Sequence, residues 1–133
     1  MKLADLSLRK GEYGGGFSAV DHFNGAPRYI RITDITDNGD LTLDVKAPSG
    51  RPDEWAQYEL AHGDLLFARS GATVGKTLLF DQAMGPSVYA GYLIRFRVDP
   101  KVADPKYVHY YTKTPAYWQW VLSKQRVVAQ PNI

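Results

Sequence analysis

The stretch GDLLFARSGATVGK, residues 63–76, decides how the rest of the chain is interpreted. An apolar run at 65–68 ends at Arg69, and a loop with two glycines and small hydroxyl residues follows. A second apolar run begins directly after Lys76. Two short apolar runs around a glycine-rich segment are typical of a β-hairpin. The sequence therefore predicts two paired strands joined by a glycine-rich, cationic loop.

The size and composition of the chain bound its class. With 133 residues, 44% hydrophobic and 23% charged, the chain favours one globular domain over residues 1–133. No apolar run approaches the roughly 20 residues that a membrane helix needs, and the first residues are too polar for a signal peptide. The sequence has no cysteine, which excludes disulfides and thiolate metal sites. We therefore expect a cytoplasmic protein with no membrane partner.

Charge is unevenly distributed along the chain. Residues 34–64 hold two Lys/Arg against eight Asp/Glu, whereas residues 65–133 hold nine against three. Such a chain can present a cationic face to a polyanion although its net charge is only +2. The same distribution also fits an ordinary solvated surface.

Residues upstream of the central stretch predict another hairpin. In YIRIT, residues 29–33, the two isoleucines face the core and the other three side chains face outward if the segment is a strand. DNGD at 37–40 is a strong turn signal, and residues 41–45 alternate again. We therefore expect a hairpin over residues 29–45. Residues 46–54, with two prolines and a glycine, are expected to form a loop.

The second half of the chain predicts a long strand and then helices. Residues 88–98 read as one strand, with Arg95 and Arg97 on one face. Asp104-Pro105 and Thr114-Pro115 each resemble a helix N-cap followed by proline at the first helical position, which predicts helices over about 106–113 and 116–124. Strands first and helices last indicate an α+β fold: a twisted, mainly antiparallel sheet with C-terminal helices packed on it.

Three catalytic interpretations fail on the residues. A phosphate loop needs glycine five positions before its Gly-Lys, but Ser70 stands there and an apolar run rather than a helix follows. Pro52-Asp53 with a later Asp-Pro-Lys triplet, at 99–101 or 104–106, could serve a metal-dependent nuclease, yet a strand end and a helix cap explain the two triplets. The three histidines match no metal-ligand spacing. We find no catalytic residues, cofactor site or metal site.

What remains is a binding surface that mixes cations with hydroxyl groups. Arginine and lysine can contact DNA phosphates, and arginine can bridge guanine in the major groove. The alternative is that these cations only solvate an open sheet face. The candidate DNA-binding residues are Tyr29, Arg31, Thr33, Arg69, Ser70, Thr73, Lys76, Arg95 and Arg97.

Four stretches, in this order, resemble one family. They are YIRITDI (29–35), GDLLFARSGATVGK (63–76), AGYLIRFRVD (90–99), and PKYVHYYTKTPAYWQWV (105–121) with the late AQPNI (129–133). Their order and spacing resemble the target recognition domain of type I restriction–modification DNA specificity subunits. The resemblance covers nearly the whole chain.

This resemblance implies sequence-specific recognition of duplex DNA, largely through the major groove, by a non-catalytic subunit. It also implies a methyltransferase subunit as partner and, through it, a restriction subunit; S-adenosylmethionine, ATP and magnesium would belong to those partners. Family members usually carry two such domains, with long helices that pair as a coiled coil. The sequence does not contain these helices, so a single recognition domain is expected.

Two classes of function therefore stay open. The first is a DNA-reading module of a restriction–modification system. The second is a small relative that binds another protein, or modified DNA, in a defence or regulatory system. The target bases do not follow from the sequence.

Overall fold

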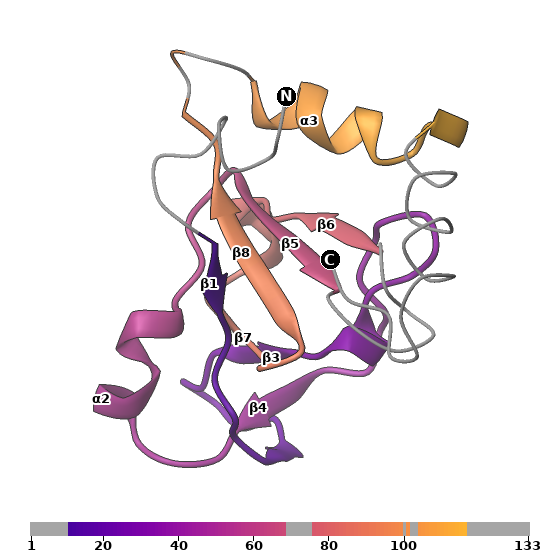
Figure 1. Ribbon diagram of the computed structural model, residues 1–133. Coiled ribbons are helices and arrows are strands. Elements are labelled where there is room, and N and C mark those ends of the chain that lie inside the picture. Colours follow the sequence, from indigo (N-terminus) through magenta and orange to yellow (C-terminus); the bar gives the residue numbers. More distant parts are fainter. Residues whose placement is uncertain (1–10, 69–75, 100, 102–103, 117–133) are drawn as a thin grey trace, which may run out of the picture.

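The computed structural model describes residues 11–68, 76–99, 101 and 104–116. Short strands dominate the described chain, with brief helical segments between them (Figure 1). The strands are β1 (Glu12–Tyr13), β2 (Ala19–Asp21), β3 (Arg28–Ile30), β4 (Lys46–Pro48), β5 (Asp64–Ala68), β6 (Thr77–Leu79), β7 (Ser87–Tyr89) and β8 (Leu93–Arg97). The helices are α2 (Pro52–Trp55) and α3 (Pro105–Tyr111), with 3₁₀ segments η1 (Ile32–Asp34), η2 (Ala56–Tyr58) and η4 (Gln82–Met84).

The central sheet has the strand order β1-β8-β5-β6, and all its neighbouring strands are antiparallel. All of β5 is buried, as its continuous apolar run predicts for a central strand. Leu66 pairs with Leu78 on β6 and with Arg95 on β8. The predicted hairpin around residues 63–80 is therefore confirmed at both strands, while residues 69–75 lie outside the described part of the chain.

Helix α3 lies across one end of the central sheet and packs on β5 and β6 (Figure 1). The side chain of Asp104 accepts a hydrogen bond from the backbone N–H of Lys106, and Pro105 is the first helical residue. The predicted cap is thus confirmed. Residues 117–124 of the second expected helix lie outside the described residues.

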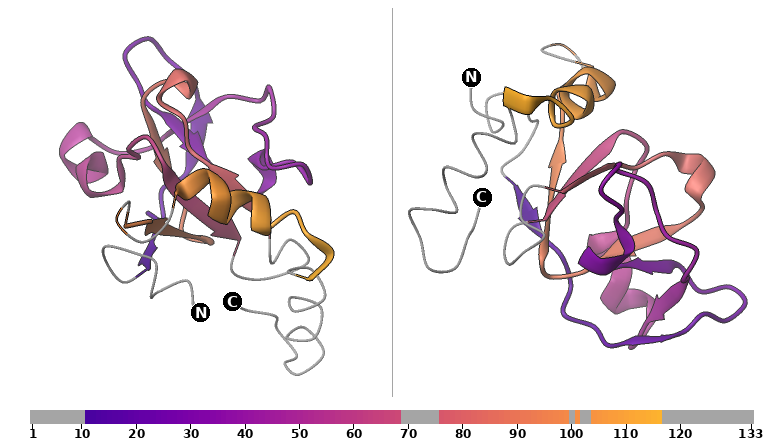
Figure 2. Two further views of the ribbon diagram at one scale, coloured as in Figure 1. Left: turned by 90° about the horizontal axis from the view of Figure 1, so that it is seen from above. Right: turned by 90° about the vertical axis from the view of Figure 1, so that its right-hand side faces the viewer.

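Two small strand pairs complete the fold. β2 pairs antiparallel with β4, and β3 pairs parallel with β7. Figure 2 shows the β2–β4 pair on the side of the molecule away from α3. The predicted hairpin over residues 29–45 is wrong, because β3 has its partner far along the chain and residues 42–45 are not a strand. Only the turn survives, closed by an Ile35–Leu41 bridge.

Two further expectations are corrected. Residues 46–54 are not simply a loop, since they contain β4 and the start of α2. The long strand over 88–98 is broken after Tyr89 by a turn, so that β7 and β8 belong to different sheets. The break turns the chain from β7, which pairs with β3, back to β8 in the central sheet.

The core forms where the central sheet meets the β3–β7 pair. Ile30, Leu66, Leu78, Tyr89 and Leu93 are all completely buried in one cluster. A second cluster gathers around Tyr29, Trp55, Val88 and Ala90, with Phe17 and Tyr58 packed against it. Edge-to-face contacts link the aromatic rings, with 5.6 Å between the centroids of Phe17 and Tyr58.

Glycine 14 allows the first strand to close against this core. A Cβ at Gly14 would lie 2.0 Å from the carbonyl oxygen of Ala90, a distance that no side chain tolerates. The N–H groups of Gly14 and Gly15 donate to the carbonyls of Leu93 and Tyr89 at 3.2 and 3.0 Å. Gly14 and Gly15 therefore serve a close approach of two backbones.

The observed architecture is α+β, as the sequence predicts, with one parallel strand pair beside a mainly antiparallel sheet. Among the described residues, no helix is long and apolar enough to cross a membrane.

Candidate nucleic-acid interface

Arg31 is held in place by a buried carboxylate. It precedes the 3₁₀ turn η1, and its backbone N–H donates to Oδ2 of Asp34 at 2.9 Å. Its guanidinium donates from Nε to Oδ2 at 3.0 Å and from Nη2 to Oδ1 at 2.8 Å. This two-point contact fixes the orientation of the guanidinium. The hydrogen bond with Asp34 is also the main cause that raises the pKa of Arg31, so the group stays charged.

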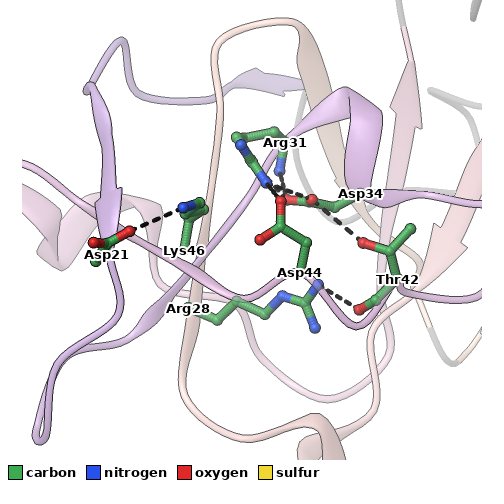
Figure 3. Close-up of polar contacts among 7 residues, drawn as sticks. All are labelled: Asp21, Arg28, Arg31, Asp34, Thr42, Asp44 and Lys46. Carbon is green, nitrogen blue, oxygen red and sulfur yellow. Dashed lines mark hydrogen bonds and ion pairs between the residues drawn. The ribbon is translucent and has the colours of Figure 1, made fainter.

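Two more cations and two exposed carboxylates lie in the same region as Arg31 (Figure 3). Asp44 approaches Nη2 of Arg31 at 3.2 Å, and Asp21 contacts Nζ of Lys46 at 3.0 Å. Arg28 donates from Nη2 to the carbonyl of Thr42 at 2.8 Å. We call Arg28, Arg31 and Lys46 the cationic cluster; its three charges are balanced by the carboxylates of Asp21, Asp34 and Asp44.

Sequence reasoning missed two of these three cations. In a strand, Arg28 would lie on the same face as Ile30, and the sequence pattern therefore places it toward the core. In the structure, the buried Nε of Arg28 has no hydrogen-bond partner among the described residues. Lys46 lies in a segment that was expected to be a loop. The β2–β4 register, which puts Asp21 opposite Lys46, joins distant segments. No local pattern signals either residue.

Thr33 lies on the same segment as Arg31, and the side chain of Lys76 contacts the end of that segment. Thr33 is exposed on η1. Nζ of Lys76 donates to the carbonyl of Ile35 at 3.4 Å and lies 3.2 Å from a carboxylate oxygen of Asp37. Arg31 and Thr33 therefore lie at η1, and Nζ of Lys76 lies beside Ile35 and Asp37, which follow η1. We call Arg31, Thr33 and Lys76 the η1 surface.

The glycine-rich loop begins and ends beside Lys76. The N–H of Ala68 donates to the carbonyl of Lys76 at 2.9 Å, which ties the two flanking residues together. Arg69, Ser70 and Thr73 fall within 69–75, outside the described residues, so their predicted contacts with DNA stay predictions.

Tyr29 does not face outward, which corrects the strand alternation predicted for it. Its side chain is buried, and its hydroxyl donates to the carbonyls of Gly15 and Phe17 at 2.7 and 3.0 Å. Burial raises the pKa of the phenol, partly opposed by the hydrogen bond with Phe17. The strand ends at Ile30, so the alternation that predicted an exposed Tyr29 does not continue through residue 33. Tyr29 is a structural residue.

Arg95 is also turned inward rather than exposed. Its side chain is only 3% exposed, and its Nη1 donates to the carbonyl of Glu59 at 2.7 Å. Nη2 reaches the carboxylate of Glu12 at 3.2 Å. The guanidinium lies 5.0 Å from the ring centroid of Tyr89, whose pKa burial raises to about 12. Arg95 therefore joins β1, β8 and the η2 segment instead of forming an outer surface.

Arg97 is partly exposed but lies apart from the η1 surface. Its Nε donates to Oδ1 of Asp64 at 3.1 Å, at the start of β5. Lys76 lies beside Ala68, at the end of β5. The five residues of β5 separate these two positions, a span of roughly 13 Å at the usual rise of a strand.

A cavity of about 420 Å³ opens beside the turn at residues 37–40. It is lined by the turn itself and by Thr77, Thr112 and Lys113. The hydroxyls of Thr77 and Thr112 lie 2.7 Å apart and bond each other. Behind Gly39, the buried Nε2 of His109 makes no hydrogen bond among the described residues. Burial lowers the pKa of His109, with a further contribution from Lys113 and an opposing one from Asp40.

Within the described ranges, no three histidine, cysteine or acidic side chains are arranged to hold a metal ion. The η1 surface and the cationic cluster present hydrogen-bond donors and positive charges, the groups that contact phosphates in protein–DNA complexes.

Comparison with known proteins bears on the fold. No family model matches the sequence, and no curated protein matches it. Among solved structures, a chain from a structure described as "Structural basis underlying complex assembly and conformational transition of the type I R-M system" shares the fold with a TM-score of 0.65 and 14% identity. The match covers 100% of this chain and 34% of that chain. The protein thus has the fold of part of a type I restriction–modification component.

Proposed function

We propose that this chain is a recognition module for duplex DNA, the target recognition domain of a type I restriction–modification specificity subunit. The observation that carries the proposal is the fold shared along the whole chain with a component of such a system, at a TM-score of 0.65. The four sequence stretches that resemble the target recognition domain, in their order along the chain, also support the proposal. The whole of 1–133 would then act as one recognition domain.

The η1 surface supplies the chemistry for phosphate contact. Arg31 is a charged group whose orientation is fixed by Asp34, which reduces the entropy lost on binding. Lys76 and the hydroxyl of Thr33 lie along the same segment. Arg69, Ser70 and Thr73 belong to the loop that starts and ends beside Lys76, and we assign them to base or phosphate contacts.

The proposed partners follow from the same assignment. A methyltransferase subunit would act at the site that this chain selects, and a restriction subunit would join through it. S-adenosylmethionine, ATP and magnesium would be bound by those subunits, while this chain itself would be non-catalytic.

The direct test is a titration of the full chain with random and selected duplexes at low salt, repeated over a salt series. We expect binding that weakens steeply with salt, because phosphate contacts release counterions. Selection from random duplexes and sequencing of the bound pool should return one enriched motif. Absence of duplex binding at low salt would rule out the proposal.

One observation favours a protein-binding module as the second candidate. On α3, the side chains of Tyr107 and Tyr110 are 73% and 63% exposed, and exposed tyrosines are frequent in protein interfaces. Replacing both tyrosines with serine separates the two candidates. A DNA-recognition module should keep its affinity for duplex DNA. A protein-binding module should lose its affinity for its protein partner.

A further inference from the structure

The cationic cluster is neutralised by its own carboxylates. Two of its three partly exposed cations, Arg31 and Lys46, each contact an aspartate that is much more exposed: Asp44 is 65% exposed and Asp21 is 97% exposed. Exposed ion pairs of this kind are weak, because water screens both charges. A phosphate oxygen that approaches the cluster would meet the same two cations that these carboxylates occupy.

The two carboxylates of Arg31 play different roles. Asp34 is buried and takes both Nε and Nη2, so it positions the guanidinium. Asp44 reaches only Nη2, at the longer distance of 3.2 Å, from a stretch with no regular structure. Asp44 can therefore leave while Asp34 keeps the arginine in place.

The position of Asp44 couples Arg31 to Lys46. Charge interactions link Lys46 with both Asp44 and Arg31, in addition to its hydrogen bond with Asp21. Asp44 therefore contacts Arg31 directly and interacts with Lys46 through its charge; Figure 3 shows the three side chains in one region. A phosphate that replaces Asp44 would gain two cationic partners at once.

We propose that Arg31 and Lys46 form a phosphate-binding pair for the DNA backbone, and that Asp44 occupies it as an internal competitor until a duplex displaces the carboxylate. This inference rests on the proposed DNA-binding function and deepens it. Lys46 becomes a contact residue, and Asp44 sets how strongly the chain holds DNA of any sequence.

The test compares Asp44→Asn with Asp53→Asn in the full chain. Asp53 is also an exposed carboxylate next to an arginine, on α2, so both variants change the net charge equally. Binding to a random-sequence duplex is measured by fluorescence anisotropy from low to physiological salt. We expect Asp44→Asn to bind several-fold more tightly with about the same salt slope, because the bound duplex makes the same phosphate contacts once the carboxylate of Asp44 is displaced. Asp53→Asn should bind like the natural chain.

A second variant assigns the gain to Lys46. In the double variant Asp44→Asn, Lys46→Ala, the affinity should return to about that of the natural chain. Equal affinities for Asp44→Asn and Asp53→Asn, while the natural chain binds duplex, overturn the competitor and leave the proposed function intact. Weaker binding by Asp44→Asn would make Asp44 a positioning residue and overturn it as well. If neither the natural chain nor Asp44→Asn binds duplex, both proposals are wrong.

Discussion

The backbone of Gly39 lies directly against the imidazole of His109. A Cβ at residue 39 would stand 3.0 Å from Nε2 of His109 and 3.2 Å from the carbonyl oxygen of Thr77. Gly39 also has a φ of +83°, which favours glycine. This contact joins the turn at residues 37–40 to α3 and β6. Gly39 and Thr77 also line the cavity described above.

Substitution of Gly39 by alanine should therefore destabilise the fold for two reasons. The positive φ alone costs an alanine about 1 kcal/mol, and the contacts with His109 and Thr77 should add about 1 kcal/mol more. Gly25→Ala is the matched control, because Gly25 has a φ of +88° but nothing within 4 Å of a Cβ. Chemical denaturation should show a larger loss for Gly39→Ala; equal losses would contradict the close contact.

The buried imidazole also predicts how stability depends on pH. Burial lowers the pKa of His109 in the folded protein below the ordinary value of 6.5. Below that value, the unfolded chain binds a proton that the folded chain resists, so acidification should lower the free energy of unfolding. Chemical denaturation between pH 7 and pH 5 should show this loss. This loss of unfolding free energy on acidification should be smaller in His109→Gln. It should be unchanged in His22→Gln, which replaces an exposed histidine.

Should His109→Gln fail to fold, an NMR titration of the natural chain gives the same answer. The His109 ring signals should then titrate below the ordinary histidine range, and a pKa at or above 6.5 would contradict the prediction.

Tyr29→Phe should affect stability and leave DNA binding unchanged. The variant loses the two hydrogen bonds to Gly15 and Phe17 and leaves their carbonyls in a buried setting, at a cost of about 1 to 2 kcal/mol. Tyr92→Phe, at an exposed tyrosine, is the control and should cost nothing measurable. A fall in duplex affinity of the folded Tyr29 variant would return Tyr29 to the binding surface.

Asp34→Ala should damage both the fold and the binding surface. It removes the buried carboxylate that holds Arg31, and breaking such a pair costs about 3 kcal/mol. Duplex affinity, measured below the unfolding transition, should fall because the guanidinium loses its fixed orientation. Asp53→Ala controls for the lost charge. Unchanged affinity in a folded Asp34→Ala variant would show that the orientation of Arg31 does not matter.

Lys76→Ala should lower the affinity for all duplexes alike and reduce the salt slope by about one, if Nζ contacts a phosphate. Lys106→Ala, at an exposed position on α3, serves as the control for removing one lysine charge. A loss confined to one sequence would make Lys76 a base reader, and no loss would remove it from the interface.

Local patterns predicted the elements that form from neighbouring residues. The hairpin around residues 63–80 and the capped start of α3 are of this kind, since the partner strand or the capping side chain lies close in the sequence. The turn at 37–40 was found for the same reason.

Distant pairing explains the errors. Residues 29–33 alternate like one strand of a hairpin, yet the strand that forms there, β3, pairs with β7. Leu43, which lies in the second strand of the expected hairpin, is 99% exposed because no strand pairs beside it. The burial of Arg95 depends on Glu12 and on the Glu59 carbonyl, which the fold brings in from other segments. Of the candidate site, the sequence therefore indicated Arg31, Thr33 and Lys76 but not Lys46.

The pairing of β1 with β8 has a consequence for how the chain folds. The first described strand, Glu12–Tyr13, is joined to Arg95 and Ile94, near the other end of the described chain. During synthesis, Tyr13 leaves the ribosome long before its partner exists, and β3 likewise waits for β7. Such remote pairings slow folding, because loop closure must precede the contacts that stabilise it. We therefore expect cooperative folding only after β8 has emerged, and a nascent chain that ends before residue 93 should remain sensitive to protease.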